Sequence, residues 1–156
     1  MRIHLVAVGT RMPPWVVEGY QQYAKRLPRE CNMQLTEIPL CKRHKSITPV
    51  QARQQEGQAM LAAVPNNCTV IALDVRGNHW STQDLAGRLR DWMGSGRDVA
   101  LLVGGPDGLS SSCLDRADQC WSLSALTYPH ALVRIVLAEQ LYRVWTLNTG
   151  HPYHRS

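Results

Sequence analysis

Three glycines fall within five positions where an apolar run ends, in the segment LLVGGPDG at residues 101–108. Loops of this kind often hold nucleotide phosphates through successive backbone N–H groups, commonly with a lysine nearby. Here Pro106 removes one donor, and the lysine of a P-loop is missing from the sequence that follows. The glycines still allow the backbone to approach a ligand closely, which favours a nucleoside without phosphates. A tight turn without any ligand is the alternative.

A second segment that could contribute to a functional site spans residues 122–145, SLSALTYPHALVRIVLAEQLYRVW. Its first part is small, polar and turn-like, and Pro129-His130 starts a helix. Arg134 falls on an apolar face of that helix, so it needs a carboxylate, carbonyl groups or a ligand. The chain then ends in HPYHRS at 151–156, a tail rich in aromatic and titratable groups.

A run of basic residues follows the second apolar run, in the segment PLCKRHKSITP. The chain has 17 Lys and Arg against 12 Asp and Glu, a net charge of +5, which suits a polyanionic partner such as nucleic acid. Lys42, Arg43 and Lys45 are therefore candidates for contacts with RNA phosphates. A solvated surface loop is the alternative, because runs of like charge usually face water.

Alternating strand-like and helix-like segments must position these groups. Apolar runs predict strands at 2–9, 33–40, 69–75, 98–105 and 119–123. Helix-start signals and apolar periodicity predict helices that begin at Pro13-Pro14, run from Thr48 to before Pro65, run from Ser81 to Gly94, and cover about 109–117 and 131–147. This alternation predicts an α/β fold, with a mostly parallel sheet and helices on both faces.

Ligands of open parallel sheets bind beyond the carboxyl ends of the strands. Three such ends carry suitable sequences, at Leu73-Asp74, at Gly104-Gly105 and at Leu123. We therefore expect these three ends to form the binding pocket.

The gross composition limits the remaining choices. A chain of 156 residues fits one domain, 1–156, and 44% of its residues are hydrophobic, as in ordinary globular proteins. No apolar run is long enough for a membrane span, and the N-terminus reads as a strand rather than a signal peptide, so we expect a cytoplasmic protein. The five cysteines are odd in number and form no C-x-x-C pair, which argues against a disulfide framework and a structural zinc site.

Several segments together resemble the RlmH family of ribosomal RNA methyltransferases, which belongs to the SPOUT, or α/β-knot, superfamily. They are VAVGT, ALD, LLVGGPDGLS, the segment from Trp121 to Trp145, and HPYHRS. The resemblance covers the whole chain and is most specific in the last forty residues. It implies a homodimer that binds S-adenosylmethionine in a C-terminal trefoil knot. It also implies methylation of N3 of a pseudouridine in large-subunit ribosomal RNA, at the subunit interface.

The resemblance also implies roles for individual residues. Near the presumed pocket, the groups able to accept the proton or stabilise the developing anion are His130, Tyr153, His154 and Arg155, of which we take His130, Tyr153 and Arg155 as the catalytic candidates. His130 alternatively only caps its helix. No single general base follows from the sequence. The cofactor would contact the three strand ends, at Leu73, Gly104, Leu123, Ser124, Ala125, Leu126, Thr127 and Tyr128.

Two rival functions remain at this point. A non-catalytic RNA-binding factor of ribosome assembly would keep the basic surface without needing the methyl donor. A phosphate-binding hydrolase would need a lysine or metal-binding carboxylates at the strand ends, where Asp74 and Asp107 are the only candidates.

The last predicted helix is apolar around most of its circumference. This implies that it is covered from two directions, by the sheet and by a partner subunit. The tail from Gly150 to Ser156 leaves the end of this helix, so pairing of two subunits through the helix would carry the tail toward the partner's pocket.

Overall fold

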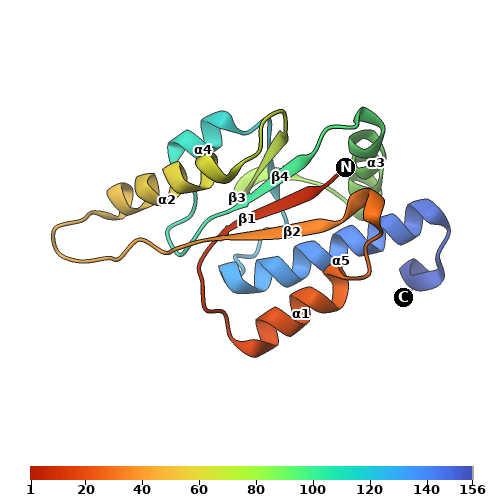
Figure 1. Cartoon of the computed structure of the whole chain (residues 1–156), viewed down its shortest axis with the longest axis horizontal. Coiled ribbons are helices and arrows are strands. Elements are labelled where there is room, and N and C mark those ends of the chain that lie inside the picture. Colours follow the sequence, from red (N-terminus) through yellow and green to blue (C-terminus); the bar gives the residue numbers. More distant parts are fainter. Residues whose placement is uncertain (156) are drawn as a thin grey trace.

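One five-stranded parallel sheet forms the centre of the protein (Figure 1). The computed structural model describes residues 1–155, and their side chains as far as Tyr153. The strands lie in the order β2-β1-β4-β3-β5, and each neighbouring pair is parallel. This arrangement confirms the predicted parallel sheet. The strands are β1 (Ile3–Val8), β2 (Met33–Ile38), β3 (Thr69–His79), β4 (Val99–Val103) and β5 (Gln119–Ser122).

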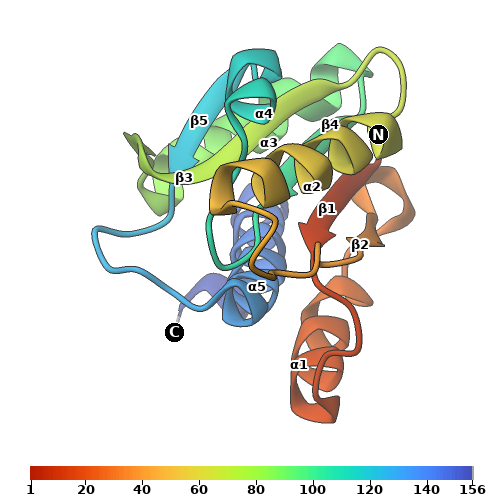
Figure 2. The ribbon, with the colours of Figure 1, turned by 90° about the vertical axis from the view of Figure 1, so that its left-hand side faces the viewer.

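Helices cover both faces of this sheet, as Figures 1 and 2 show. One face carries α1 (Pro14–Ala24), α3 (Thr82–Ser95) and α5 (His130–Thr149), and α5 contacts both of the others. The opposite face carries α2 (Pro49–Ala63) and α4 (Ser111–Arg116). Short 3-10 helices, η1 (Arg29–Cys31) and η2 (Pro152–Arg155), complete the described chain. The trefoil knot stays a prediction.

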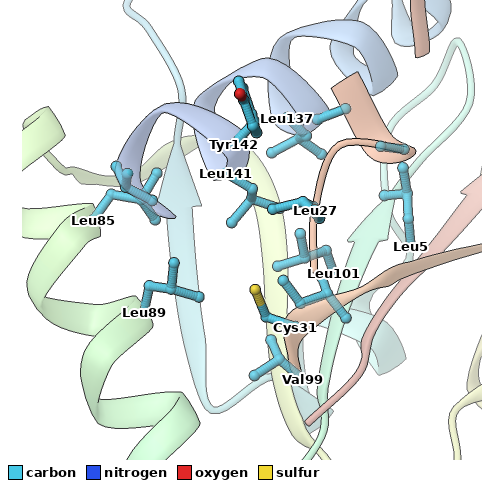
Figure 3. Packing of buried hydrophobic residues seen from close by; sticks show 14 of the residues in the cluster. Leu5, Leu27, Cys31, Leu85, Leu89, Val99, Leu101, Leu137, Leu141 and Tyr142 are labelled. Atoms are coloured by element: carbon cyan, nitrogen blue, oxygen red, sulfur yellow. The ribbon is translucent and has the colours of Figure 1, made fainter. Parts of the chain in front are cut away.

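Strands β1 and β4 are buried throughout because helices cover both of their faces. Leu5 and Leu101 point to the face of α5, where Leu137 and Leu141 of that helix meet them (Figure 3). Val6 points to the opposite face, under α2 and α4. The continuous apolar runs of the sequence therefore correspond to strands with two buried sides.

Local capping signals fix the starts of two helices. The Thr48 hydroxyl accepts a hydrogen bond from the Gln51 N–H at 3.1 Å, and the Gln51 side chain accepts one from the Thr48 N–H at 2.9 Å. Ser81 and Asp84 make the same reciprocal pair at 3.0 and 2.9 Å. Both predicted helix starts are thus confirmed, since each pair satisfies two backbone donors of the first turn.

The end of α3 differs from the prediction. The helix was expected to end at Gly94, but it continues to Ser95, whose hydroxyl donates to the Trp92 carbonyl at 2.8 Å. Gly96 is the residue that adopts the left-handed conformation, with φ of 72°. Glycine tolerates that conformation without a Cβ penalty, so Gly96 terminates the helix.

Strand β3 also runs further than predicted, to His79 rather than residue 75. Its pairing with β5 is irregular between Leu73 and Asn78. At Gly77 a Cβ atom would lie 2.7 Å from the backbone of both Cys120 and Trp121. Only glycine fits such a close approach, and the irregularity lets β3 resume its pairing beyond it.

Candidate active site

The carboxyl ends of three adjacent strands enclose a cavity of about 600 Å³. Leu73 of β3, Gly104 after β4 and Leu123 after β5 all line it. Figure 2 shows the segment between β5 and α5 extending away from the sheet before it returns to the helix. The structure therefore brings together the three strand ends that the sequence predicted as a pocket.

The glycine loop after β4 closes into a tight turn. The Gly108 N–H donates to the Gly105 carbonyl at 3.0 Å, and Gly108 has a φ of 81°. A Cβ atom on Gly104 would lie 2.5 Å from the carbonyl carbon of Gly108. Glycine at position 104 is thus needed for the turn itself. A side chain at this position would enter space that the loop itself occupies.

The segment after β5 forms a second wall of the cavity. The Ser122 hydroxyl donates to the Ser124 carbonyl at 3.0 Å, and the Ser124 hydroxyl accepts from the Leu126 N–H at 3.0 Å. These bonds shape a turn that Ala125 shares, although Ala125 does not line the cavity. The lining residues of this segment are Leu123, Ser124, Leu126, Thr127 and Tyr128.

His130, at the start of α5, lines the cavity from the side of β1. A Cβ atom on Gly9 would lie 3.4 Å from its Nε2 atom and 3.5 Å from the Arg134 guanidinium. Burial lowers the pKa of His130, and the nearby positive charge of Arg134 lowers it further. The imidazole is therefore predominantly neutral at neutral pH and has a ring nitrogen able to accept a proton.

Arg134 has a carboxylate and a backbone carbonyl as partners, although its buried Nε atom has no hydrogen-bond partner among the described residues. Its side chain is 2% exposed, and its guanidinium donates to Glu37 Oε2 at 2.6 Å and to the Gly9 carbonyl at 2.8 Å. Glu37 belongs to β2, and Gly9 follows β1. The arginine thus ties α5 to two neighbouring strand ends beside the cavity.

Tyr153 lies far from the cavity of its own chain. Its hydroxyl donates to Glu139 Oε1 at 3.0 Å, and its ring packs edge-on against Tyr142 at 4.7 Å between centroids. Burial raises the pKa of Tyr153 to about 12, and the Glu139 carboxylate adds to this effect. Glu139 comes nine residues after His130 in α5. It therefore lies about 14 Å further along the helix than His130 and on the opposite side of the helix. The side chain of Arg155 lies outside the described residues.

The basic loop contains two different environments. Lys42 and Lys45 are exposed. Arg43 is also accessible, with a side chain 29% exposed, but it differs from the lysines by forming ion pairs with Glu56 of α2 and with Asp107 of the glycine loop. Hydrogen bonds to Glu56 and then to Asp107 raise the pKa of Arg43 above its ordinary value.

Some residues of the cavity were not predicted as ligand contacts. Asp74 belongs to a strand end that was expected in the pocket, but it was not among the residues predicted to contact the cofactor. Its carboxylate accepts hydrogen bonds from Arg76, which lower its pKa. Arg53 and Trp121 also line the cavity. Trp121 belongs to the strand whose end was predicted in the pocket, whereas no local signal marks Arg53, because α2 reaches the cavity only through the tertiary fold.

The described residues can also be searched for metal-ligand clusters and for membrane-spanning helices. Among them, no group of three or more His, Cys, Asp or Glu residues is arranged to hold a metal ion. Asp74 and Asp107, the two carboxylates that a hydrolase would use, are each paired with an arginine. Within the described part of the chain, no helix combines the length and apolar character that crossing a membrane requires.

Comparisons with known proteins identify relatives along the whole chain. A family model described as "Predicted SPOUT methyltransferase" matches residues 1–154. The chain is 58% identical over 155 residues to the protein named ribosomal RNA large subunit methyltransferase H of Thioalkalivibrio sulfidiphilus, with 99% of each chain covered. It is 56% identical over 156 residues to the protein of the same name from Nitrosococcus oceani, covering 100% of this chain and 99% of the relative.

Solved structures share the fold at much lower identity. A methylase family protein from Haemophilus influenzae superposes with a TM-score of 0.57 at 11% identity, over 97% of this chain and 69% of the other. A methylase family protein from Neisseria gonorrhoeae gives a TM-score of 0.51 at 15% identity, over 90% and 80% of the two chains. These similarities support the fold, whereas the full-length relatives bear on the family.

Proposed function

The chain belongs to the SPOUT methyltransferase family, and we propose that it methylates N3 of a pseudouridine in large-subunit ribosomal RNA, with S-adenosylmethionine as the donor. The names of relatives with 54–58% identity support ribosomal RNA of the large subunit as the substrate class. The single observation that carries the proposal is the cavity where the ends of β3, β4 and β5 meet. The RNA would be presented within the large subunit or the assembled ribosome, and we therefore propose a cytoplasmic location.

The residues of this cavity fit such a donor. Its volume of about 600 Å³ lies within the range of small-molecule sites. The glycine turn offers backbone groups, and Leu73, Trp121 and Leu123 offer apolar surface. Two arginines line the cavity, but Arg76 pairs with Asp74 and Arg53 donates to the Asp107 carbonyl. When bound, the donor supplies an electrophilic methyl group on a sulfonium.

The chain's own residues would prepare the acceptor nitrogen. N3–H of pseudouridine is a weak acid, so its proton must leave as the new bond forms. His130 faces the cavity in its neutral form, and its imidazole would accept this proton. Holding the base in line with the donor would supply much of the remaining acceleration.

A second copy of the chain would complete this site. Tyr153 cannot reach the cavity of its own subunit while it packs on Glu139 and Tyr142. Several apolar side chains of α5 remain half-buried, including Ile135 and Trp145, and a partner would cover them. We therefore propose a homodimer, the commonest closed assembly, in which Tyr153 and Arg155 approach the partner's cavity and orient the RNA base.

A pair of matched variants tests the cofactor site. Thr127→Trp places a large side chain on the wall of the cavity, whereas Ala125→Trp places the same side chain on the same exposed turn, off the wall. Calorimetric titration should show S-adenosylmethionine binding at least about tenfold weaker in Thr127→Trp, a loss of about 1.4 kcal/mol. Ala125→Trp should bind like the wild type. Equal affinities in both variants would place the donor elsewhere.

The reaction itself is tested by mapping. Ribosomal particles that lack the modification, incubated with the protein and the donor, should gain one methyl group at N3 of a large-subunit pseudouridine. A wild-type protein that binds RNA but neither binds the donor nor modifies the particles would instead be a non-catalytic assembly factor of this fold.

A further inference from the structure

The basic loop and the glycine loop contact each other through Arg43. Its Nη2 atom donates to Asp107 Oδ2 at 2.7 Å, and its Nε donates to the same oxygen at 3.1 Å. These residues are separated by 64 positions in the sequence. The contact therefore joins two loops that are brought together only by the fold.

Arg43 is anchored on its other side by a buried carboxylate. The Glu56 side chain is 2% exposed, and its Oε2 atom accepts hydrogen bonds from Arg43 Nη1 and from the Cys41 N–H. Arg43 Nη1 also donates to the Cys41 carbonyl. All three guanidinium nitrogens of Arg43 thus have protein acceptors, and an RNA phosphate would have to displace one of them. Lys42 and Lys45 are exposed beside it.

Asp107 is held at two points. Its side chain accepts from Arg43, and its backbone carbonyl accepts from Arg53 Nη1 at 3.3 Å. It occupies the middle of the turn that Gly105 and Gly108 close, and this turn lines the cavity. A displacement of Asp107 would therefore move the wall of the cavity.

We propose that Arg43 is a positioning residue, which holds the glycine turn in its binding shape from the buried Glu56, and that it is not a ligand of RNA phosphate. The proposal revises the sequence-based expectation for Arg43 and leaves Lys42 and Lys45 as the phosphate candidates of the loop. It rests on the proposed function in one respect, namely that the ligand of the cavity is the methyl donor.

The discriminating variant is Arg43→Lys. A lysine keeps a positive charge near Glu56, which avoids leaving that buried carboxylate unpaired, but its single ammonium cannot reproduce the fork that bridges Glu56 and Asp107. Affinity for S-adenosylmethionine without RNA should fall about five- to tenfold, as expected for a partly exposed charged hydrogen-bond pair. Amide hydrogen exchange in the turn 105–108 of the free protein should accelerate by a similar factor.

Kinetics and a matched control separate positioning from RNA binding. In Arg43→Lys the KM for the donor should rise. In Arg43→Gln, which also removes the charge, the KM for RNA and the salt dependence of RNA binding should stay at wild-type values. Lys45→Ala should show the reverse, with a weaker RNA complex and unchanged donor affinity. Should Arg43→Lys fail to fold, Asp107→Ala removes the acceptor of the same contact and should accelerate exchange in the turn likewise.

Two results would overturn the proposal. One is unchanged donor affinity and unchanged exchange in Arg43→Lys. The other is a salt slope of RNA binding reduced by about 0.7–0.9 in Arg43→Gln, which removes the charge that Arg43→Lys keeps, because that is the change expected when one phosphate is no longer neutralised. Failure of the wild type to bind the donor would overturn the proposed function instead. The exchange comparison, which needs no ligand, would still decide whether Arg43 holds the turn.

Discussion

Replacing Arg134 by methionine should destabilise the protein and change the titration of His130. The Arg134 side chain is 2% exposed and donates to Glu37 Oε2 and to the Gly9 carbonyl, at 2.6 and 2.8 Å. Methionine fills similar space but donates no hydrogen bond. The buried Gly9 carbonyl then loses its donor, whereas Glu37, 36% exposed, can be hydrated.

The magnitude follows from these two partners. A hydrogen bond to a charged group contributes about 1.5–3 kcal/mol, and a stranded buried carbonyl costs about 1–3 kcal/mol. Hydration of Glu37 and relief of the dehydrated guanidinium offset part of this loss. We expect the free energy of unfolding to fall by about 2–3 kcal/mol. For a chain of this size, that corresponds to a Tm lower by about 4–12 °C.

The second readout is the pKa of His130. Burial is the larger cause of its lowered pKa, and the charge of Arg134 is the next. Of these two causes, Arg134→Met removes the charge and leaves the burial of His130 in place. The pKa of His130 should therefore rise but stay below the ordinary value of 6.5. The folded wild type has a lowered His130 pKa, whereas the unfolded chain titrates near the ordinary value of 6.5. As the pH falls below 6.5, the unfolded chain therefore binds a proton first, and the free energy of unfolding decreases. Above pH 6.5 the imidazole is neutral in both states and this loss is absent. This loss should be smaller in the variant.

The measurements are chemical denaturation and NMR titration of the imidazole, with Arg116→Met as the control. Arg116 and Asp118 form an exposed pair at 3.6 Å, so that variant should differ from the wild type by less than about 1 kcal/mol. The reasoning is refuted if Arg134→Met is as stable as Arg116→Met and His130 titrates as in the wild type.

Three further predictions concern catalysis and RNA. His130→Gln should lower the rate of methyl transfer by about 10²–10⁴-fold, and the wild-type rate should decline only below pH 6.5, since its neutral form is needed; a rate that is already falling above this pH would exclude the role. The double variant Lys42→Ala/Lys45→Ala should lower the salt slope of RNA binding by about 0.7–0.9 for each phosphate that the loop no longer neutralises, and an unaltered slope would leave the loop as solvated surface. Mixed dimers of Thr127→Trp and a chain lacking 151–156 should regain activity at one of two cavities, because one cavity then receives an intact wall and an intact tail; verified subunit exchange without recovered activity would confine the tail to its own chain.

Much of the fold was encoded in short stretches of sequence. Thr48 with Gln51, and Ser81 with Asp84, lie within one helical turn of each other, so their capping bonds need no distant partner. The apolar runs predicted buried strands because central parallel strands are covered on both faces. The cavity followed from the same logic, since the carboxyl ends of parallel strands share one edge, where Leu73 lies.

Tertiary packing decided what the residue types left open. In the sequence Arg43 resembles its lysine neighbours, yet only Arg43 meets Glu56 and Asp107, which lie 13 and 64 positions away. Gly104 signalled a loop, but its missing Cβ faces Gly108 rather than a ligand. Hydrogen bonds within one turn depend on adjacent residues alone, whereas the partners of a long side chain depend on which segments the fold brings beside it.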